Sequence, residues 1–287
     1  LFPYTTLFRS PENSKNIHLK NVIANGNSDD GIWIRESNEI RLENIETSFN
    51  GDNGIFITAS NTIDLKTVFA SDNGYDGIYI VDSNEIHLED IEANDNDDNG
   101  IYTNNSTKID LENIETNGNK NDGIVIEASN TIDLKTAVAS DNKQNGIAIS
   151  NSTKIDLKNI EAQDNQEGIY IDICPALELN LKGRILLNEN EFDGLWATDT
   201  TGNITNFGEI VADNNVEDYG ILLGDNSNVV FFIANDASLS ACGNGKGDIS
   251  VSATSTLSLL GVGTCTGSTD GDGQFPNPNC EPCSSSN

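Results

Sequence analysis

Apolar residues along much of the chain alternate with polar ones in short runs that recur at a fixed interval. In one such unit Ile32 and Ile34 alternate with polar neighbours, Ile40 and Leu42 do the same, and Ile45 follows. An alternation of period two is typical of half-buried β-strands, and the runs are too short for helices. The pattern therefore predicts three short strands in each unit.

The units repeat along the chain with a glycine at the same place in each. The period is 23 residues, with one step of 22, and looser copies follow at Gly194, Gly220 and Gly247. The regular anchors are Gly31, Gly54, Gly77, Gly100, Gly123, Gly146 and Gly168. A fixed period of this size indicates a solenoid, in which each unit buries its apolar face by stacking on its neighbours. We predict an all-β parallel β-helix of about ten coils and three parallel sheets.

Equivalent residues of successive coils should lie on top of one another, so columns can be read for chemistry. One asparagine column lies four residues before each anchor and predicts a ladder in which each amide donates to the next carbonyl oxygen. Its members are Asn27, Asn50, Asn73, Asn96, Asn119 and Asn142. Directly before the anchors, aspartate and asparagine alternate. We expect each amide there to lie between two carboxylates and donate to both. A serine column at the second turn has Cys174 in its seventh place.

The repeat has the form N-x-x-[DN]-G-I-x-I-x-x-S-N-x-I-x-L and resembles the right-handed parallel β-helix proteins of the pectate-lyase-like superfamily. The resemblance covers residues 11–174 closely and 175–262 loosely. It implies a right-handed solenoid. It does not imply one function, because that superfamily contains lyases, hydrolases, epimerases, adhesins and spacers.

Four segments are predicted. Residues 1–10, "LFPYTTLFRS", match a translated sequencing adapter and are expected to be non-native, with the native N-terminus missing. Residues 11–174 should form the regular coils, and 175–265 less regular coils with a C-terminal cap. Residues 266–287 have the composition of a Cys/Pro/Ser-rich tail.

Charge and cysteines narrow the class of partner and the compartment. With 46 acidic and 15 basic residues the net charge is −31, so nucleic acid and acidic lipid should be repelled. No apolar run is long enough for a transmembrane helix.

Four of the five cysteines lie near the C-terminus, which favours disulfides and an extracellular or cell-surface location. Cys242 and Cys265 are one coil apart and could pair, and Cys280 and Cys283 could close a small loop.

A calcium site is one interpretation of "DNDDNG". The stretch matches the first half of an EF-hand loop, but the twelfth position is Ser106 and strands should flank it. Asp95, Asp97 and Asp98 remain as turn carboxylates that could hold Ca²⁺, and no cofactor is required by the sequence.

An aromatic stripe is the second candidate site. The outward position two residues after the anchor glycine carries Trp33, Phe56, Tyr79 and Tyr102 in successive coils. Rings at this spacing could stack on one another and stabilise the sheet, or they could bind sugar rings.

The outward column of the second sheet includes His87 between Asp64 and Asp110, followed by Asp133 and Asp156. Carboxylates one coil apart match the spacing in a retaining glycosidase, but every column of a β-helix has nearly that spacing. Lys66, Lys135 and Lys158 nearby predict charge compensation. The resemblance would imply further catalytic motifs for a polygalacturonase or an alginate epimerase, and His18 and His87 fit neither. It would imply a basic residue beside calcium-binding aspartates for a pectate lyase, whose acidic substrate suits a strongly anionic surface badly.

We therefore expect a non-catalytic secreted or cell-surface module with a structural, adhesive or carbohydrate-binding role, whose partner is a polysaccharide or cell-surface glycan. The alternative is a polysaccharide-active enzyme, that is, a lyase, glycoside hydrolase or epimerase.

Overall fold

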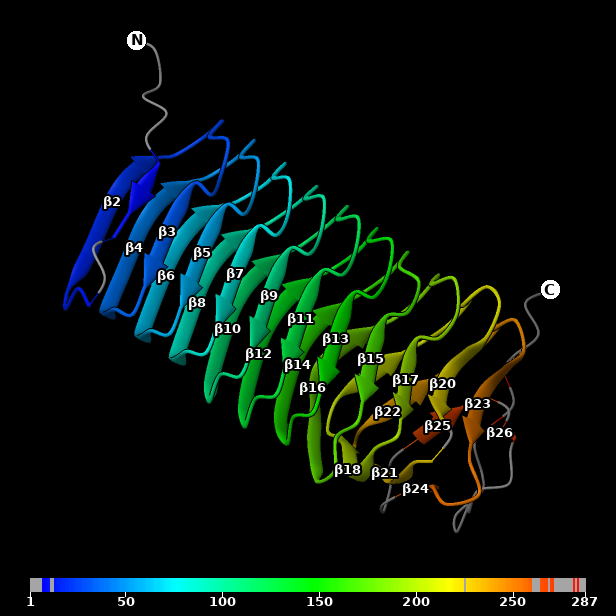
Figure 1. The fold of residues 1–287 in the computed structure, drawn as a ribbon. Coiled ribbons are helices and arrows are strands. Elements are labelled where there is room, and N and C mark those ends of the chain that lie inside the picture. The colour runs from blue at the N-terminus through cyan, green and yellow to red at the C-terminus, as the bar shows by residue number, and fades with distance from the viewer. Residues whose placement is uncertain are drawn as a thin grey trace. The chain divides into compact units, whose positions relative to one another are not determined.

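A computed structural model describes residues 7–10, 13–224, 226–259, 264–267, 269–270, 281 and 283. The described residues form strands and turns, with no helix among them. Two compact units can be distinguished, Leu1–Gln144 and Asn145–Asn287, which are called unit 1 and unit 2 below. All strand pairs in both units are parallel (Figure 1). The predicted all-β parallel solenoid is thus confirmed, whereas the predicted change in regularity at residue 174 stays a prediction.

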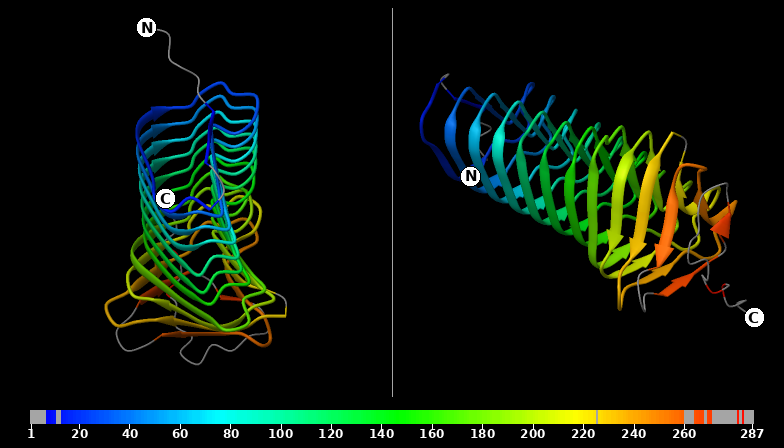
Figure 2. Two further views of the ribbon diagram at one scale, coloured as in Figure 1. Left: turned by 60° about the vertical axis from the view of Figure 1, so that its left-hand side comes forward. Right: turned by 90° about the horizontal axis from the view of Figure 1, so that it is seen from below.

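Unit 1 contains two sheets whose strands alternate along the chain, one from each sheet per coil. The first sheet consists of β1 (Phe8–Arg9), β3 (Ile32–Arg35), β5 (Ile55–Thr58), β7 (Ile78–Val81), β9 (Ile101–Asn104) and β11 (Ile124–Glu127). The second consists of β2 (Ile17–Ile23), β4 (Asn38–Glu46), β6 (Asn61–Phe69), β8 (Asn84–Glu92), β10 (Lys108–Glu115) and β12 (Thr131–Val138). Figure 2 shows these coils stacked one on the next. Neighbouring first-sheet strands are in register at a shift of one repeat, as in the pairing of Phe56 with Tyr79.

The third strand predicted for each coil is continuous with the second in unit 1. Within β4 the chain turns at Asn44, whose φ is +58°, and Asp90 in β8 has a φ of +56°. One left-handed residue bends the strand without ending its pairing, and asparagine and aspartate tolerate this conformation better than most residues. Ile45, beyond the bend, is buried and continues the core.

In unit 2 the third strand of some coils is separate from the second and belongs to a minor sheet. Its first sheet consists of β13 (Ile147–Ser150), β15 (Ile169–Asp172), β17 (Leu195–Thr198), β20 (Tyr219–Leu223), β23 (Gly247–Val251) and β26 (Thr269–Asp270). Its second sheet consists of β14 (Lys154–Glu161), β16 (Leu177–Leu186), β18 (Thr201–Asn206), β21 (Asn228–Ile233) and β24 (Thr256–Leu259). A minor sheet consists of β19 (Glu209–Val211), β22 (Ser238–Ser240) and β25 (Thr264–Thr266). Strand β16 pairs with both β18 and β19, so the minor sheet begins where the long strand of the regular coils divides in two.

The core consists of isoleucine and leucine ladders together with a buried asparagine ladder, as the sequence predicts. In unit 1 the Asn50 Nδ2 donates to the Asn73 Oδ1 at 3.0 Å, and the Asn73 Nδ2 donates to the Asn96 Oδ1 at 3.0 Å. The backbone N–H groups of Asn50 and Asn73 donate to the same oxygens. From Asn50 to Asn119, each of these turns therefore buries a side-chain amide that is hydrogen-bonded to the next coil, so that the amide itself is not left unpaired.

The anchor glycines are required by close stacking of the backbone. A Cβ atom added to Gly77 would lie 2.6 Å from the Ala70 carbonyl oxygen and 2.7 Å from that of Gly100. Both obstacles are backbone atoms, so larger residues cannot be accommodated by a side-chain shift.

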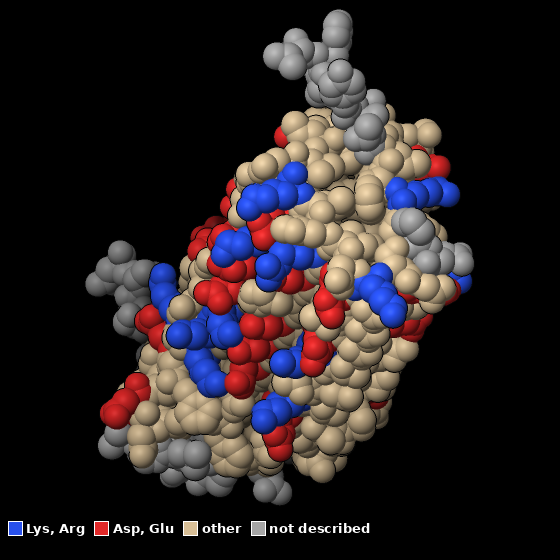
Figure 3. Space-filling model, turned by 90° about the vertical axis from the view of Figure 1, so that its left-hand side faces the viewer, with Lys and Arg blue, Asp and Glu red and all other residues tan. Residues whose placement is uncertain are grey.

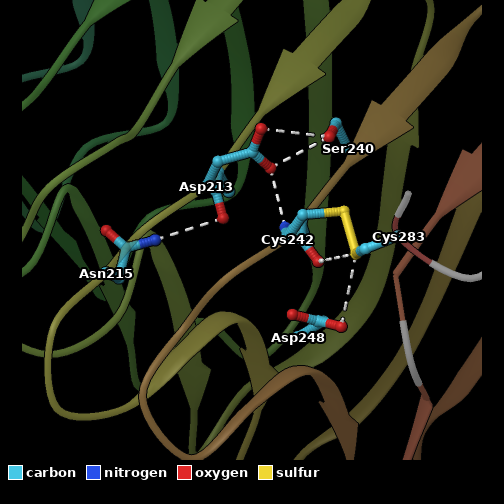
Figure 4. Close-up of a disulfide and its surroundings, with 8 residues drawn as sticks. Asp213, Asn215, Ser240, Cys242, Asp248 and Cys283 are labelled. Atoms are coloured by element: carbon cyan, nitrogen blue, oxygen red, sulfur yellow. Dashed lines mark hydrogen bonds between the residues drawn. A yellow bond between two sulfur atoms is a disulfide. The ribbon is translucent and has the colours of Figure 1, made fainter. Parts of the chain in front are cut away.

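The cysteines of unit 2 pair differently from the expectation. Cys242 forms a disulfide with Cys283, 41 residues away, so the expected pairings of Cys242 with Cys265 and of Cys280 with Cys283 are both wrong (Figure 4). Cys265 is also disulfide-bonded. The turn holding Cys242 is fixed by Asp213, whose carboxylate accepts hydrogen bonds from the Cys242 N–H and the Ser240 hydroxyl.

Cys174 is buried with a free thiol. It occupies the serine column as expected, since its Sγ accepts from the Ser152 N–H at 3.4 Å. In the part of the chain that the structure describes, no helix has the length and apolar character needed to cross a membrane.

Candidate functional site

The aromatic stripe lies on the outer face of the first sheet of unit 1. Strands β3, β5, β7 and β9 place Trp33, Phe56, Tyr79 and Tyr102 in direct register. All four side chains are half-buried. The sequence prediction of one ring per coil therefore holds in the geometry.

The rings stack face to face along the column. Centroids of Phe56 and Tyr79 are 5.2 Å apart at an interplanar angle of 9°, and those of Tyr79 and Tyr102 are 5.0 Å apart at 7°. Trp33 and Phe56 are 6.4 Å apart at 5°. Parallel rings at 5 Å cannot lie side by side in one plane, so each covers a face of the next, and the stack presents ring edges to solvent. A sugar ring therefore cannot lie flat on Phe56 or Tyr79.

Both ends of the ring stack contact further side chains. The Arg9 guanidinium lies 5.4 Å from the Trp33 ring centroid, although Arg9 belongs to the segment predicted to be non-native and supports no functional argument. At the other end the Tyr102 hydroxyl donates to the Glu127 carboxylate at 2.8 Å and accepts from the Asn104 amide at 3.0 Å. Burial, and then the bond to Glu127, raise the pKa of Tyr102 to about 12.

The three turn carboxylates of the calcium hypothesis lie in different surroundings. The Asp97 carboxylate forms an ion pair with Lys120 at 2.5 Å, and both side chains are about half exposed. Asp95 is exposed in a left-handed turn position, and Asp98 is partly exposed. Among the described residues, no three histidine, cysteine, aspartate or glutamate side chains are grouped so that they could hold a metal ion. A calcium site at Asp95, Asp97 and Asp98 stays a prediction.

The column before the anchors shows how the buried carboxylates are accommodated. The Asn99 Nδ2 donates to the Asp76 Oδ1 at 2.8 Å, and the Asn53 Nδ2 donates to the Asp30 Oδ1 at 2.9 Å. The Asn53 Oδ1, in turn, accepts from the backbone N–H of Asp76. The expectation that each amide donates to both carboxylates is therefore wrong. The Asn53 amide donates to the carboxylate of the preceding coil, and its oxygen is turned toward the backbone N–H of the following coil. Burial raises the pKa of Asp76 to about 7, against the opposing effect of the Asn99 hydrogen bonds.

Ion pairs neutralise the outward column of the second sheet. The Lys135 Nζ lies 3.1 Å from the Asp110 Oδ1 and 2.9 Å from the Asp133 Oδ2. Hydrogen bonds to these carboxylates raise the pKa of Lys135. The His87 Nδ1 lies 3.3 Å from the other oxygen of Asp110. A retaining hydrolase needs one free carboxylate nucleophile beside a protonated acid, and here a lysine joins the two aspartates.

Charge compensation extends along this surface but differs from the prediction at two of the lysines. Lys66 pairs with Glu89 at 2.6 Å, and Asp64 is paired by Arg41 at 3.0 Å. Asp156 is paired by Lys182 at 2.8 Å and not by Lys158. Figure 3 shows basic and acidic groups interleaved on one face of the molecule. Such exposed pairs each contribute little to stability, but they leave no concentrated field of one sign on that face.

Hollows occur elsewhere on unit 1, and sequence reasoning missed them. One of about 430 Å³ lies at the bend of β6, β8, β10 and β12, between Phe69 and Val138, with Glu92 and Glu115 along it. Another of about 370 Å³ lies at the turns, beside Phe49. Phe49 is 66% exposed. The sequence could have drawn attention to it, because it is a bulky residue in a column that otherwise holds glycine and aspartate.

Comparison with known proteins bears on the fold. Residues 11–166 match the family described as "Right handed beta helix region". The chain belongs to this right-handed β-helix family. No curated protein matches the sequence.

Solved structures of low sequence identity are also similar to this chain. The A-module of the Azotobacter vinelandii mannuronan C-5 epimerase AlgE6 is 13% identical, with 94% of this chain and 80% of that chain covered and a TM-score of 0.46. The A-module of AlgE4 from the same organism is 14% identical, with 94% and 79% covered and a TM-score of 0.43. Pectate lyase Pel9A is 13% identical, with 97% and 71% covered and a TM-score of 0.40.

Proposed function

We propose that this β-helix protein is a non-catalytic module, secreted or at the cell surface, with a structural or adhesive role that includes carbohydrate binding. The observation that carries the proposal is that the polar and aromatic columns of unit 1 are satisfied by their own neighbours. Amides bond to amides, rings cover rings, and lysines bridge aspartates. Groups satisfied in this way stabilise a scaffold and are not free for acid–base chemistry.

The disulfide supports the proposed location. Cys242 and Cys283 are paired and Cys265 is also bonded, and structural disulfides persist in oxidising compartments. The net charge of −31 favours a neutral or basic partner over an anionic polymer. The proposed partner is therefore a polysaccharide or cell-surface glycan without a dense negative charge.

The aromatic stripe has a specific part in this proposal. Because the ring faces of Phe56 and Tyr79 are covered, the stripe acts mainly by holding the first sheet together. Contact with a glycan at Trp33, Phe56, Tyr79 and Tyr102 would use ring edges and tyrosine hydroxyls. The paired changes Tyr79→Ser and Tyr102→Ser should then lower stability while altering glycan-array binding little.

Activity measurements test the absence of catalysis. The protein is incubated with pectin, alginate and neutral polysaccharides, with and without Ca²⁺, while unsaturated products, reducing ends and epimer ratio are followed. We expect no turnover. Turnover that disappears in a variant carrying Asp110→Asn and Asp133→Asn would establish the enzyme alternative and refute the proposal.

A further inference from the structure

Phe49 lies at a turn position where a bulky side chain is unfavourable. The equivalent residues of neighbouring coils, five before each anchor, are Gly26, Asp72, Asp95, Gly118 and Asp141. Its φ of +58° is in the left-handed region, which disfavours a residue with a large side chain. The side chain is 66% exposed, so core packing does not offset this strain. An exposed aromatic residue held in a strained conformation indicates a role outside the core.

A shallow hollow of about 370 Å³ lies beside Phe49. Its other lining residues include Gly51 and Gly74. A Cβ atom on Gly74 would lie 2.2 Å from the Gly51 carbonyl oxygen, and one on Gly51 would lie 2.4 Å from that of Ser28. Side chains are thus excluded there, which leaves the floor of the hollow as bare backbone next to an aromatic wall.

Hydrogen-bond acceptors complete the lining. Asp72 and Asp97 both border the hollow. The Asp72 side chain is exposed and makes no hydrogen bond to another described residue, whereas Asp97 is held by Lys120. A free carboxylate accepts two hydrogen bonds from neighbouring hydroxyl groups. An aromatic face beside it attracts the C–H groups of a flat, partly apolar ring.

We propose that this hollow binds one neutral hexopyranose unit of a polysaccharide, with the sugar ring on Phe49 and its hydroxyl groups on Asp72. The inference rests on the carbohydrate-binding part of the proposed function. It places the binding site at the turns and not at the aromatic stripe of the first sheet, whose ring faces are covered. Uronic acid units are disfavoured as ligands, because their carboxylates would face the unpaired carboxylate of Asp72 on a protein of net charge −31.

The test uses the full chain and isothermal titration with β-linked glucose, galactose and mannose oligosaccharides, with oligogalacturonate as the acidic counterpart. Phe49→Gly restores the residue found at positions 26 and 118. We expect this variant to weaken neutral-sugar binding at least about tenfold and to raise the urea midpoint, because the backbone strain is removed. A residue needed only for packing would lower that midpoint. Asp72→Asn should weaken binding about fivefold.

Tyr75→Asp is the matched control. Tyr75 is 54% exposed, and aspartate stands at its equivalent position 52. Because Tyr75 does not line the hollow, binding should stay within about twofold. Neutral-sugar binding that Phe49→Gly leaves unchanged would overturn the inference but not the proposed function, since the glycan would bind elsewhere. Preference for oligogalacturonate, or no binding to any of these sugars, would also overturn it. Turnover of the sugars would contradict the non-catalytic proposal whatever Phe49 does.

Discussion

The two units solve the burial of carboxylates before the anchor glycine in different ways. In unit 1, Asp76 is followed one coil later by Asn99, which donates to it. In unit 2, Glu167 is followed by Asp193, which accepts from the backbone N–H of Tyr219 at 2.9 Å as Asp76 does from that of Asn99, but tyrosine has no side-chain amide to add a second bond. Burial, together with the charges of Asp218 and Glu167, raises the pKa of Asp193 to about 7 against the opposing effects of the Tyr219 hydrogen bond and of Lys246.

The comparison separates what the side-chain amide does from what burial does. In both units burial raises the pKa of the carboxyl group to about 7. In unit 2 the next coil carries Tyr219 where unit 1 carries Asn99, so a side-chain donor is missing, and Lys246 acts on Asp193 from its ion pair with Asp218. The aromatic columns differ likewise, since Tyr170 and Trp196 in unit 2 are tilted at 49° while the unit 1 rings are parallel.

The largest expected effect is the loss of one amide from the regular ladder. Asn96→Ala would leave the Asn73 backbone N–H without a partner. It would also remove one of the two hydrogen bonds of the Asn73 side-chain amide, which keeps the Thr47 carbonyl oxygen, and one of the two accepted by the Asn119 Oδ1, which keeps the backbone N–H of residue 96. An unpaired buried group costs about 1–3 kcal/mol and each lost hydrogen bond about 1 kcal/mol, so the free energy of unfolding should fall by roughly 4 kcal/mol. Urea denaturation followed by circular dichroism measures this. The exposed ladder change Asn61→Ala serves as the control and should cost less than about 1 kcal/mol.

The next effect is a dependence of stability on pH that both units share. A carboxyl group whose pKa rises from 3.8 to about 7 on folding binds its proton more tightly in the folded state. Stability due to that proton is complete below the unfolded pKa and is lost as the pH rises from about 4 to 7. Each group contributes at most about 4 kcal/mol to this loss.

Asparagine variants test this dependence in each unit. Asp76→Asn and Asp193→Asn should each flatten the fall in urea midpoint between pH 4 and pH 8. Asp52→Asn removes the same formal charge from a less buried position and should not flatten it. If only Asp193→Asn had an effect, Asn99 would fully accommodate the buried Asp76 of unit 1, and only unit 2 would contribute to the pH dependence.

Ring stacking should contribute more in unit 1 than in unit 2. Tyr79→Thr removes two parallel contacts and should cost roughly 2 kcal/mol, whereas Tyr170→Thr removes one tilted contact and should cost roughly 1 kcal/mol. Threonine keeps the preference for strands in both variants. Hydrogen exchange of the flanking strands β5 and β17 reports each loss locally. Equal losses in the two units would contradict a specific role for parallel stacking.

Sequence reasoning was strong where one residue type recurs at a constant interval. The strands, the asparagine ladder and the ring column follow from that interval, because stacking makes each coil the environment of the next. The direction of the Asn53 amide and the parallel planes of Tyr79 and Phe56 depend on side-chain torsions that column spacing leaves free.

Other features depend on contacts between residues far apart in the sequence or between unequal coils. The pairing of Cys242 with Cys283 could not be deduced, since a spacing of one coil favoured Cys265. The sequence shows Phe49 as the one bulky residue in a column of glycine and aspartate. Its strained backbone and its exposure follow only from the structure, because they depend on the left-handed φ and on the packing around the turn.

The smallest expected effect concerns the acidic turn. Asp97 already has a cation in Lys120, and Asp95 and Asp98 belong to no described group of ligands that could hold a metal. An exposed pair of this kind contributes little to stability. Adding Ca²⁺ should therefore change the urea midpoint of the protein and of a variant with Asp95→Asn and Asp97→Asn by the same small amount, through screening of the overall negative charge. A calcium-dependent rise in midpoint that the variant loses would instead establish an ordered site at this turn. It would also show that an irregular cluster of charge in the regular unit can bind an ion that the column geometry alone does not predict.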